Sequence, residues 1–300
     1  MPSRWLCTLI IVFWCGTMGY MFYRDWLPWL TADKEAPPFV FELADEVVTQ
    51  YALWTLYRND QKIGTARTTL RYTNENAFEW TTTLSNLTHS AKVGELEVKA
   101  EIPTMTTRMM VTPSGELIRF TTTAEMQITL IARFKAKFEI NGEVQGNSLR
   151  GQTSLTAENL PIQQPFGPIE LKSKNVFSPM QPLFRIKGLQ PGRSWKMNDF
   201  DPLNEAFRAG IQQMLDNFAK DKDGKSFLPF ALPSSKSSEV LARVSDEIQE
   251  LQIKDKTHSC YVIDYRGDNM QAKTWVKVED GMVLRQEAFG FGEQLILQRE

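Results

Sequence analysis

Apolar and polar residues alternate along most of the chain between residues 51 and 156. From Ala124 to Ile140 the even positions are apolar and the odd positions are mainly polar, and Glu95 to Ile102 alternates in the same way. Successive side chains of a strand point to opposite faces, so this period of two predicts strands with one apolar and one wet face. We expect tight turns at Pro113-Ser114-Gly115 and at Asn141-Gly142, with Glu143–Arg150 as the returning strand.

Similar strand patterns precede and follow this region. They are Tyr51–Tyr57, Thr65–Tyr72, Phe78–Leu87, Met105–Val111, Leu117–Thr123, Val240–Ile253, Ser259–Tyr265, Ala272–Val278, Met282–Phe289 and Gln294–Gln298. Asp280-Gly281 marks one more hairpin turn. Long strands in series favour a large curved antiparallel sheet over a compact sandwich of short strands. The predicted fold class is therefore mainly β (α+β), with one amphipathic helix covering the sheet.

That helix is predicted over residues 202–219. Asp201 is a suitable N-cap, Pro202 suits the first helical position, and a stripe of apolar residues at helical spacing needs an apolar partner. Residues 157–200, which are rich in proline, are predicted to be irregular with one or two short strands, such as Leu183–Ile186. Residues 220–238 are predicted to form a polar loop with an apolar insert at 227–233. The insert either packs over a sheet edge or forms a lid.

The segment from Trp5 to Tyr23 contains no charged residue. As a helix, its 19 residues would span roughly 28 Å, close to the thickness of a bilayer core. We expect residues 1–30 to be an N-terminal transmembrane anchor, 31–38 a linker and 39–300 an extracytoplasmic β domain. A cleaved signal peptide or a lipoprotein modified at Cys15 fits less well, because the expected small residues do not precede a cleavage point.

The composition limits the ligands and reactions that are expected for this protein. The net charge is −2, with 34 basic and 36 acidic residues, which predicts no nucleic-acid partner. Three cysteines and two histidines are too few for a disulfide scaffold or a zinc site, so no metal and no cofactor is expected. The sequence contains no G-x-S-x-G or H-E-x-x-H motif, which predicts a protein without catalytic residues. Cys260 is expected to be a small buried residue. Trp54, Trp80, Trp195 and Trp275 are expected to pack in the core rather than to line a ligand pocket.

The stretches Glu95–Ile102, Ala124–Arg150 and Asp201–Phe218 together resemble the LolA/LppX-like periplasmic carriers of lipids and lipoproteins. The resemblance concerns architecture over about two-thirds of the chain and implies a concave apolar cavity for acyl chains. The resemblance transfers no functional residue. As a hypothesis, we expect the cavity to be lined by Leu96, Val98, Met126, Ile128, Leu130, Phe134, Phe138, Phe207, Ile211 and Met214. Phe227, Leu228 and Phe230 would form the lid.

Two functions follow as expectations. The first is a membrane-anchored protein that binds or relays a lipid or lipoprotein in the bacterial envelope, with membrane lipid or acyl chains as its partner. It would be a single-pass protein of the bacterial inner membrane, with its C-terminal domain in the periplasm. The second is a non-catalytic accessory or structural subunit of a membrane protein complex.

Overall fold

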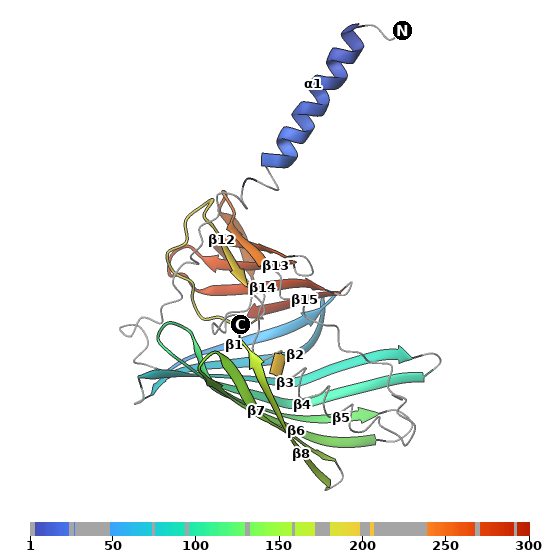
Figure 1. The fold of residues 1–300 in the computed structure, drawn as a ribbon, viewed down its shortest axis with the longest axis vertical. Coiled ribbons are helices and arrows are strands. Elements are labelled where there is room, and N and C mark those ends of the chain that lie inside the picture. Colours follow the sequence, from blue (N-terminus) through green and yellow to red (C-terminus); the bar gives the residue numbers. More distant parts are fainter. Residues whose placement is uncertain are drawn as a thin grey trace.

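The computed structural model describes residues 4–23, 27, 49–73, 76–93, 96–129, 133–157, 160–171, 181–198, 205–206, 239–267, 271–290 and 293–300. These residues form one long helix and a strongly curved antiparallel sheet (Figure 1). The predicted class, mainly β with a large curved antiparallel sheet, is confirmed. Of the predicted helix 202–219, only Glu205 and Ala206 are described, and both are helical. The rest of that helix and the loop 220–238 lie outside the described residues.

Helix α1 (Arg4–Met21) forms where the uncharged segment predicts a helix and projects from the sheet (Figure 1). Its apolar side chains are exposed, among them Trp5, Leu9 and Phe13. Among the described residues, no helix has both the length and the apolar character needed to cross a membrane. The predicted transmembrane span is therefore not supported. The apolar run is interrupted by Thr8, Thr17 and two glycines, which lower its mean hydropathy.

Within the described residues the sheet contains fifteen strands, most of them paired with their neighbours in sequence. The first eight are β1 (Gln50–Arg58), β2 (Gln61–Thr73), β3 (Ala77–Val93), β4 (Leu96–Val111), β5 (Leu117–Thr129), β6 (Arg133–Gln145), β7 (Ser148–Ala157) and β8 (Leu160–Glu170). The others are β9 (Ser194–Asn198), β10 (Glu239–Val244), β11 (Gln249–Ile253), β12 (Lys256–Arg266), β13 (Gln271–Lys277), β14 (Val283–Gly290) and β15 (Glu293–Arg299). Because β15 pairs with β1, the two ends of the β region meet in the middle of the sheet.

The prediction of one strand from Ala124 to Ile140 is wrong. β5 ends at Thr129 and β6 begins at Arg133. Even positions of β5 pair with even positions of β6, as in Ala124 with Phe138. Apolar residues therefore occupy even positions in both strands of the hairpin, so the sequence pattern gives no sign of the turn between them.

The predicted turn at Asn141-Gly142 is also wrong. Both residues lie inside β6. The chain turns at Gly146-Asn147 instead, between the paired residues Gln145 and Ser148. Gly146 has a φ of 62°, which a residue without Cβ adopts at little cost. The predicted turns at Pro113-Ser114-Gly115 and Asp280-Gly281 are confirmed, and both glycines have positive φ.

Residues 157–200 contain two strands, β8 and β9, in agreement with the predicted one or two, although β8 is longer than expected. The segment given as an example, Leu183–Ile186, is not a strand. β8 includes three prolines at positions 161, 165 and 168. It lies at one end of the strand order and pairs with β7 alone. An edge strand tolerates proline because it needs backbone donors on one side only. The predicted strand Val240–Ile253 is divided into β10 and β11 by residues 245–248.

The core lies on the inner side of the curved sheet. Trp54 and Trp195 are fully buried in one continuous apolar cluster, which also contains Trp80, as predicted. Trp275 is only partly buried and packs against a second, smaller cluster. The irregular segment 181–189 contributes Leu183, Phe184 and Ile186 to the same cluster. This segment crosses from β4, where Gln181 donates to the Met109 sulfur, to the β13–β14 turn, where the Ile186 amide donates to the Gly281 carbonyl. It therefore fills one end of the concave face.

Candidate functional site: the inner face of the curved sheet

The inner face of β2–β8 is built from three parallel rows of side chains. Directly paired residues of antiparallel strands lie on the same face, so each row can be followed across the sheet through its register. The first apolar row consists of Leu70, Trp80, Met109, Phe120, Gly142, Gly151 and Phe166. The second apolar row consists of Ala66, Leu84, Met105, Ala124, Phe138, Leu155 and Ile162.

A threonine row runs between the two apolar rows. It consists of Thr68, Thr82, Thr107, Thr122, Ile140, Thr153 and Gln164, with one position from each strand of β2–β8. Thr68 and Thr153 are fully buried, and Thr122 is nearly so. The inner face is therefore apolar along both sides and hydroxyl-bearing along its middle. The sequence pattern missed this row because threonine reads as a polar residue that belongs to the wet face.

The two apolar rows differ in burial. The described side chains of the first apolar row are buried, and segment 181–189 packs at this end through Gln181 and Met109. In the second apolar row Leu84, Met105, Leu155 and Ile162 are only half-buried. Among the described strands, the substantial backbone contacts of β2–β8 are all with hydrogen-bonded neighbours.

The structure brings together two of the predicted cavity residues. Met126 and Phe138 lie on one face of the β5–β6 hairpin, because Ala124 pairs with Phe138 and Met126 pairs with Ala136. Met126 is half-buried and packs against the core cluster, whereas Phe138 belongs to it. Four predicted residues, namely Leu96, Val98, Ile128 and Phe134, lie in strands β4–β6, but their side chains are outside the described set. Leu130, Phe207, Ile211, Met214, Phe227, Leu228 and Phe230 lie outside the described residues.

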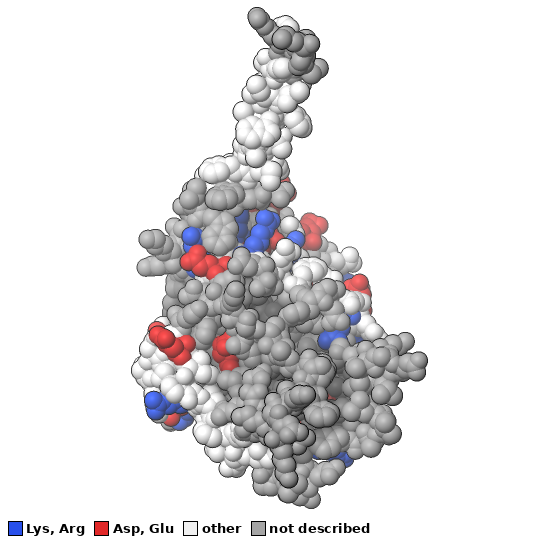
Figure 2. All heavy atoms as spheres, turned by 45° about the vertical axis from the view of Figure 1, so that its right-hand side comes forward, with Lys and Arg blue, Asp and Glu red and all other residues white. Residues whose placement is uncertain are grey.

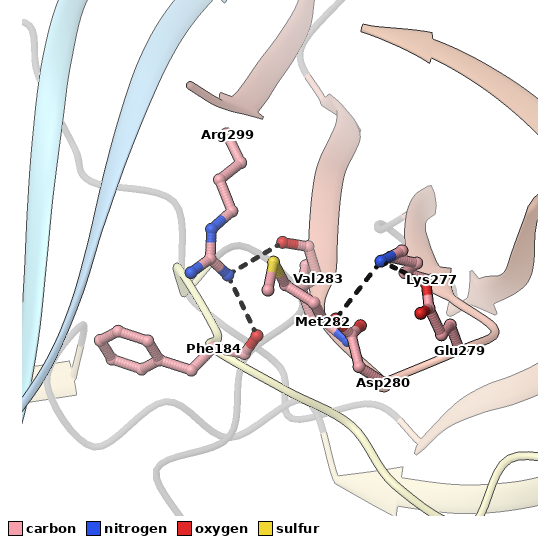
Figure 3. A network of polar contacts seen from close by, with 7 residues as sticks. All are labelled: Phe184, Lys277, Glu279, Asp280, Met282, Val283 and Arg299. Carbon is pink, nitrogen blue, oxygen red and sulfur yellow. Dashed lines mark hydrogen bonds and ion pairs between the residues drawn. The ribbon is translucent and has the colours of Figure 1, made fainter. Parts of the chain in front are cut away.

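A polar junction closes the inner face where β15 meets the β13–β14 turn (Figure 3). The Arg299 guanidinium donates from Nη1 to the Phe184 carbonyl at 3.3 Å and to the Val283 carbonyl at 3.5 Å. It also lies 5.8 Å from the centre of the Trp54 ring. Burial lowers the pKa of Arg299, nearby Arg185 lowers it further, and Asp280 opposes both effects. Arg299 thus fastens segment 181–189 to the sheet.

Acidic side chains of the β13–β14 turn surround Lys277 beside this junction (Figure 3). Lys277 Nζ lies 2.7 Å from Glu279 and 3.5 Å from Asp280. The Glu279 hydrogen bond raises the pKa of Lys277, with smaller contributions from Asp280. Asp280 also accepts from the Met282 amide at 3.0 Å. These contacts stabilise the turn, and the charged groups of Lys277, Glu279 and Asp280 are paired with one another within it.

A hollow of about 430 Å³ lies along β5–β7, where Phe120, Gly142 and Gly151 of the first apolar row and neighbouring polar residues line it. Its charged lining residues Arg119, Glu143 and Arg150 are neighbours in register, and all three are exposed. In the described part of the chain, no group of His, Cys, Asp or Glu is arranged to hold a metal ion. The charged side chains of the hollow therefore face solvent and do not converge on a buried point.

Cys260 is fully buried, as predicted. Its thiol donates to the His258 carbonyl at 3.6 Å. Burial raises the pKa of Cys260 to about 11, and Lys277 opposes this shift. A raised pKa keeps the thiol protonated, which is the opposite of the activation that a nucleophilic cysteine needs.

We expect the stability of the protein to fall as the pH rises from about 9 to about 11, partly because of Cys260. The folded thiol holds its proton more tightly than the unfolded one, so its contribution is present below pH 9 and is lost as the pH passes the folded pKa. The loss is on the order of 2 kcal/mol. Urea unfolding of the wild type and of Cys260→Ala over this pH range measures it. Equal slopes for the two proteins would contradict the assignment.

Comparison with known proteins adds little to this description. The chain matches no protein-family model, and no curated protein matches it. Among solved structures it is similar to the crystal structure of a beta-barrel-like protein of domain of unknown function DUF1849 from Brucella abortus. That match covers 85% of this chain and 97% of the other at 7% identity, with a TM-score of 0.36. At this sequence identity and TM-score, the match supports neither a fold assignment nor a role for any residue.

Proposed function

We propose that this protein binds the acyl chains of a lipid on the inner face of its curved sheet. The observation that carries the proposal is the breadth of that face: two apolar rows cross β2–β8, and four side chains of the second row are only half-buried. Each buried methylene contributes about 0.8 kcal/mol, so an apolar surface of this kind binds acyl chains without catalytic groups. The resemblance to LolA/LppX-like carriers supports the same function and the bacterial envelope as its location.

Helix α1 supports an association with membranes. Between Trp5 and Met21 it presents exposed apolar side chains and no charge (Figure 2). A contiguous exposed apolar surface of this size marks an interaction with a membrane or a protein. We infer that α1 holds the β domain at a membrane surface, from which a lipid enters the inner face.

The alternative function is an accessory subunit of a membrane protein complex. The exposed apolar surface of α1 favours it, because a helix of a partner protein would also cover that surface. The edge strand β8 argues against pairing with a partner strand, since prolines interrupt its donors. A single stable partner protein crosslinked through α1, together with an empty inner face, would support the alternative.

Native mass spectrometry of the full-length protein, purified in a mild detergent, tests the lipid proposal. We expect mass adducts of lipid size that survive purification and are lost on denaturation. Met126→Lys places a charge on the inner face and should reduce the lipid-bound fraction at least tenfold, because burying an unpaired charge is costly. Gln127→Lys is the matched control, since it lies next to Met126 on the opposite face. Absence of lipid from the wild type would overturn the proposal.

A further inference from the structure

The threonine row carries buried hydroxyl groups that have no partner in the described part of the chain. The Oγ1 atoms of Thr68, Thr82 and Thr153 are buried and make no hydrogen bond there, and the same holds for Gln164 Oε1. Thr107 and Thr122 are the exception, because their hydroxyls pair with each other at 3.1 Å. Buried polar groups are nearly always hydrogen-bonded, so each unpartnered group needs an explanation.

Threonines on the outer face behave differently. Thr83 and Thr106 pair at 3.3 Å, and Thr121 donates to Asn141 at 2.7 Å. Threonine is common in strands of every kind, so its presence on the inner face alone would mean little. The distinguishing feature is that, within β2–β8, the buried hydroxyls that have no partner in the described residues all lie in one row, between the two apolar rows.

A further donor lies beside this row. Trp54 pairs with Ala66 of the second apolar row, and its indole Nε1 is fully buried without a partner in the described residues. The inner face therefore offers three hydroxyls and one indole N–H, with apolar surface on both sides. A hydroxyl donates one hydrogen bond and accepts up to two, whereas an indole only donates.

We propose that the threonine row binds the ester carbonyls of a diacyl lipid whose acyl chains lie along the half-buried side chains of the second apolar row. This inference rests on the proposed function. An ester carbonyl is a hydrogen-bond acceptor that lies between apolar chains, and the threonine row is a line of donors that lies between apolar rows. Leaving these donors unpartnered costs free energy, and a carbonyl of the bound lipid removes that cost.

The first test compares two probes on the full-length wild-type protein. Dioleoyl phosphatidylglycerol and its dioleyl ether analogue have the same headgroup and the same chain length, but the ether analogue lacks both carbonyls. Two hydrogen bonds of ordinary strength predict that the ester lipid binds about tenfold more tightly in competition followed by native mass spectrometry. Equal binding of the two probes would overturn the ester inference and leave acyl-chain binding intact. Binding of neither probe would overturn the proposed function itself.

The second test removes the hydroxyls without changing side-chain volume much. Thr68 and Thr82 are directly paired on the inner face, and the adjacent Thr69 and Thr81 are directly paired on the outer face. We expect the double variant Thr68→Val/Thr82→Val to lose the preference for the ester lipid and to bind both probes alike. The control Thr69→Val/Thr81→Val should keep the tenfold preference.

The thermal stability of the lipid-free variants separates binding from folding. Replacing an unpartnered buried hydroxyl by a methyl group is neutral or stabilising, so the inner double variant should melt at or above the wild-type temperature. A large drop in melting temperature would show that the two hydroxyls are satisfied within the fold or by ordered water, and would overturn the inference. The comparison of ester and ether lipids on the wild type does not depend on these variants.

Discussion

Gly151→Ala is expected to destabilise the protein by about 3 kcal/mol, which is the upper end of the usual cost of overpacking. A Cβ atom at Gly151 would lie 2.0 Å from the Asn141 carbonyl oxygen and 2.4 Å from the Phe166 ring. The Asn141 carbonyl belongs to the backbone of β6, so it cannot move without disturbing the β6–β7 pairing. Urea unfolding followed by tryptophan fluorescence measures the loss.

Gly142 provides the matched comparison. A Cβ there would lie 2.3 Å from the Phe120 ring, and the nearest atoms are all from that side chain. Gly142→Ala should therefore be rescued by Phe120→Leu, whereas Gly151→Ala should not be rescued by Phe166→Leu. If Gly151→Ala were as stable as the wild type, the close approach of β6 and β7 at this point would be wrong.

Arg299→Ala is expected to destabilise the protein by a similar amount, about 3 kcal/mol. The substitution removes charge-assisted hydrogen bonds to the Phe184 and Val283 carbonyls and the contact with the Trp54 ring. Hydrogen bonds to charged groups contribute about 1.5–3 kcal/mol, and a cation–π contact contributes about 0.5–2 kcal/mol. Equilibrium unfolding in urea measures the change.

Two further variants distinguish the Arg299 junction from a general effect of charge. Arg299→Lys keeps the charge but not the planar guanidinium, so we expect it to recover less than half of the lost stability. Arg67→Ala removes an exposed arginine from β2 and should change the stability by less than about 0.5 kcal/mol. If Arg299→Ala behaved like Arg67→Ala, segment 181–189 would not be held by Arg299.

The alternation of apolar and polar residues was sufficient to predict the class of fold. A period of two identifies strands because it follows from backbone geometry within each strand. The positive-φ glycines at Gly115 and Gly281 marked two turns for an equally local reason. The buried tryptophans Trp54 and Trp195 and the buried Cys260 were also predicted, since side chains of these types are seldom fully exposed.

Two predictions of turns were wrong because the local sequence pattern does not show how the strands pair. The β5–β6 hairpin keeps even positions opposite even positions, so its alternation reads as one strand. Gly142 is a residue typical of a turn, but it lies in a strand because the Phe120 ring occupies the space of its missing side chain. Only the pairing of strands reveals that contact.

The candidate site, too, could be predicted from the sequence only in part. The apolar positions Met126 and Phe138 were predicted from their parity, and the structure places them on one face. The threonine row could not be predicted, because its members come one from each strand and align only through the registers of the pairings β2–β8.

By itself the sequence determined that most of the chain forms strands and which face of those strands is apolar. It also determined that the uncharged segment from Trp5 to Tyr23 is largely helical. These properties depend on neighbours one to four positions apart. The tertiary structure alone decided that β15 pairs with β1, that segment 181–189 fills one end of the concave face, and that five strands align threonine hydroxyls in one row. Such contacts join residues far apart in the chain, and their energies depend on a register that no local pattern encodes.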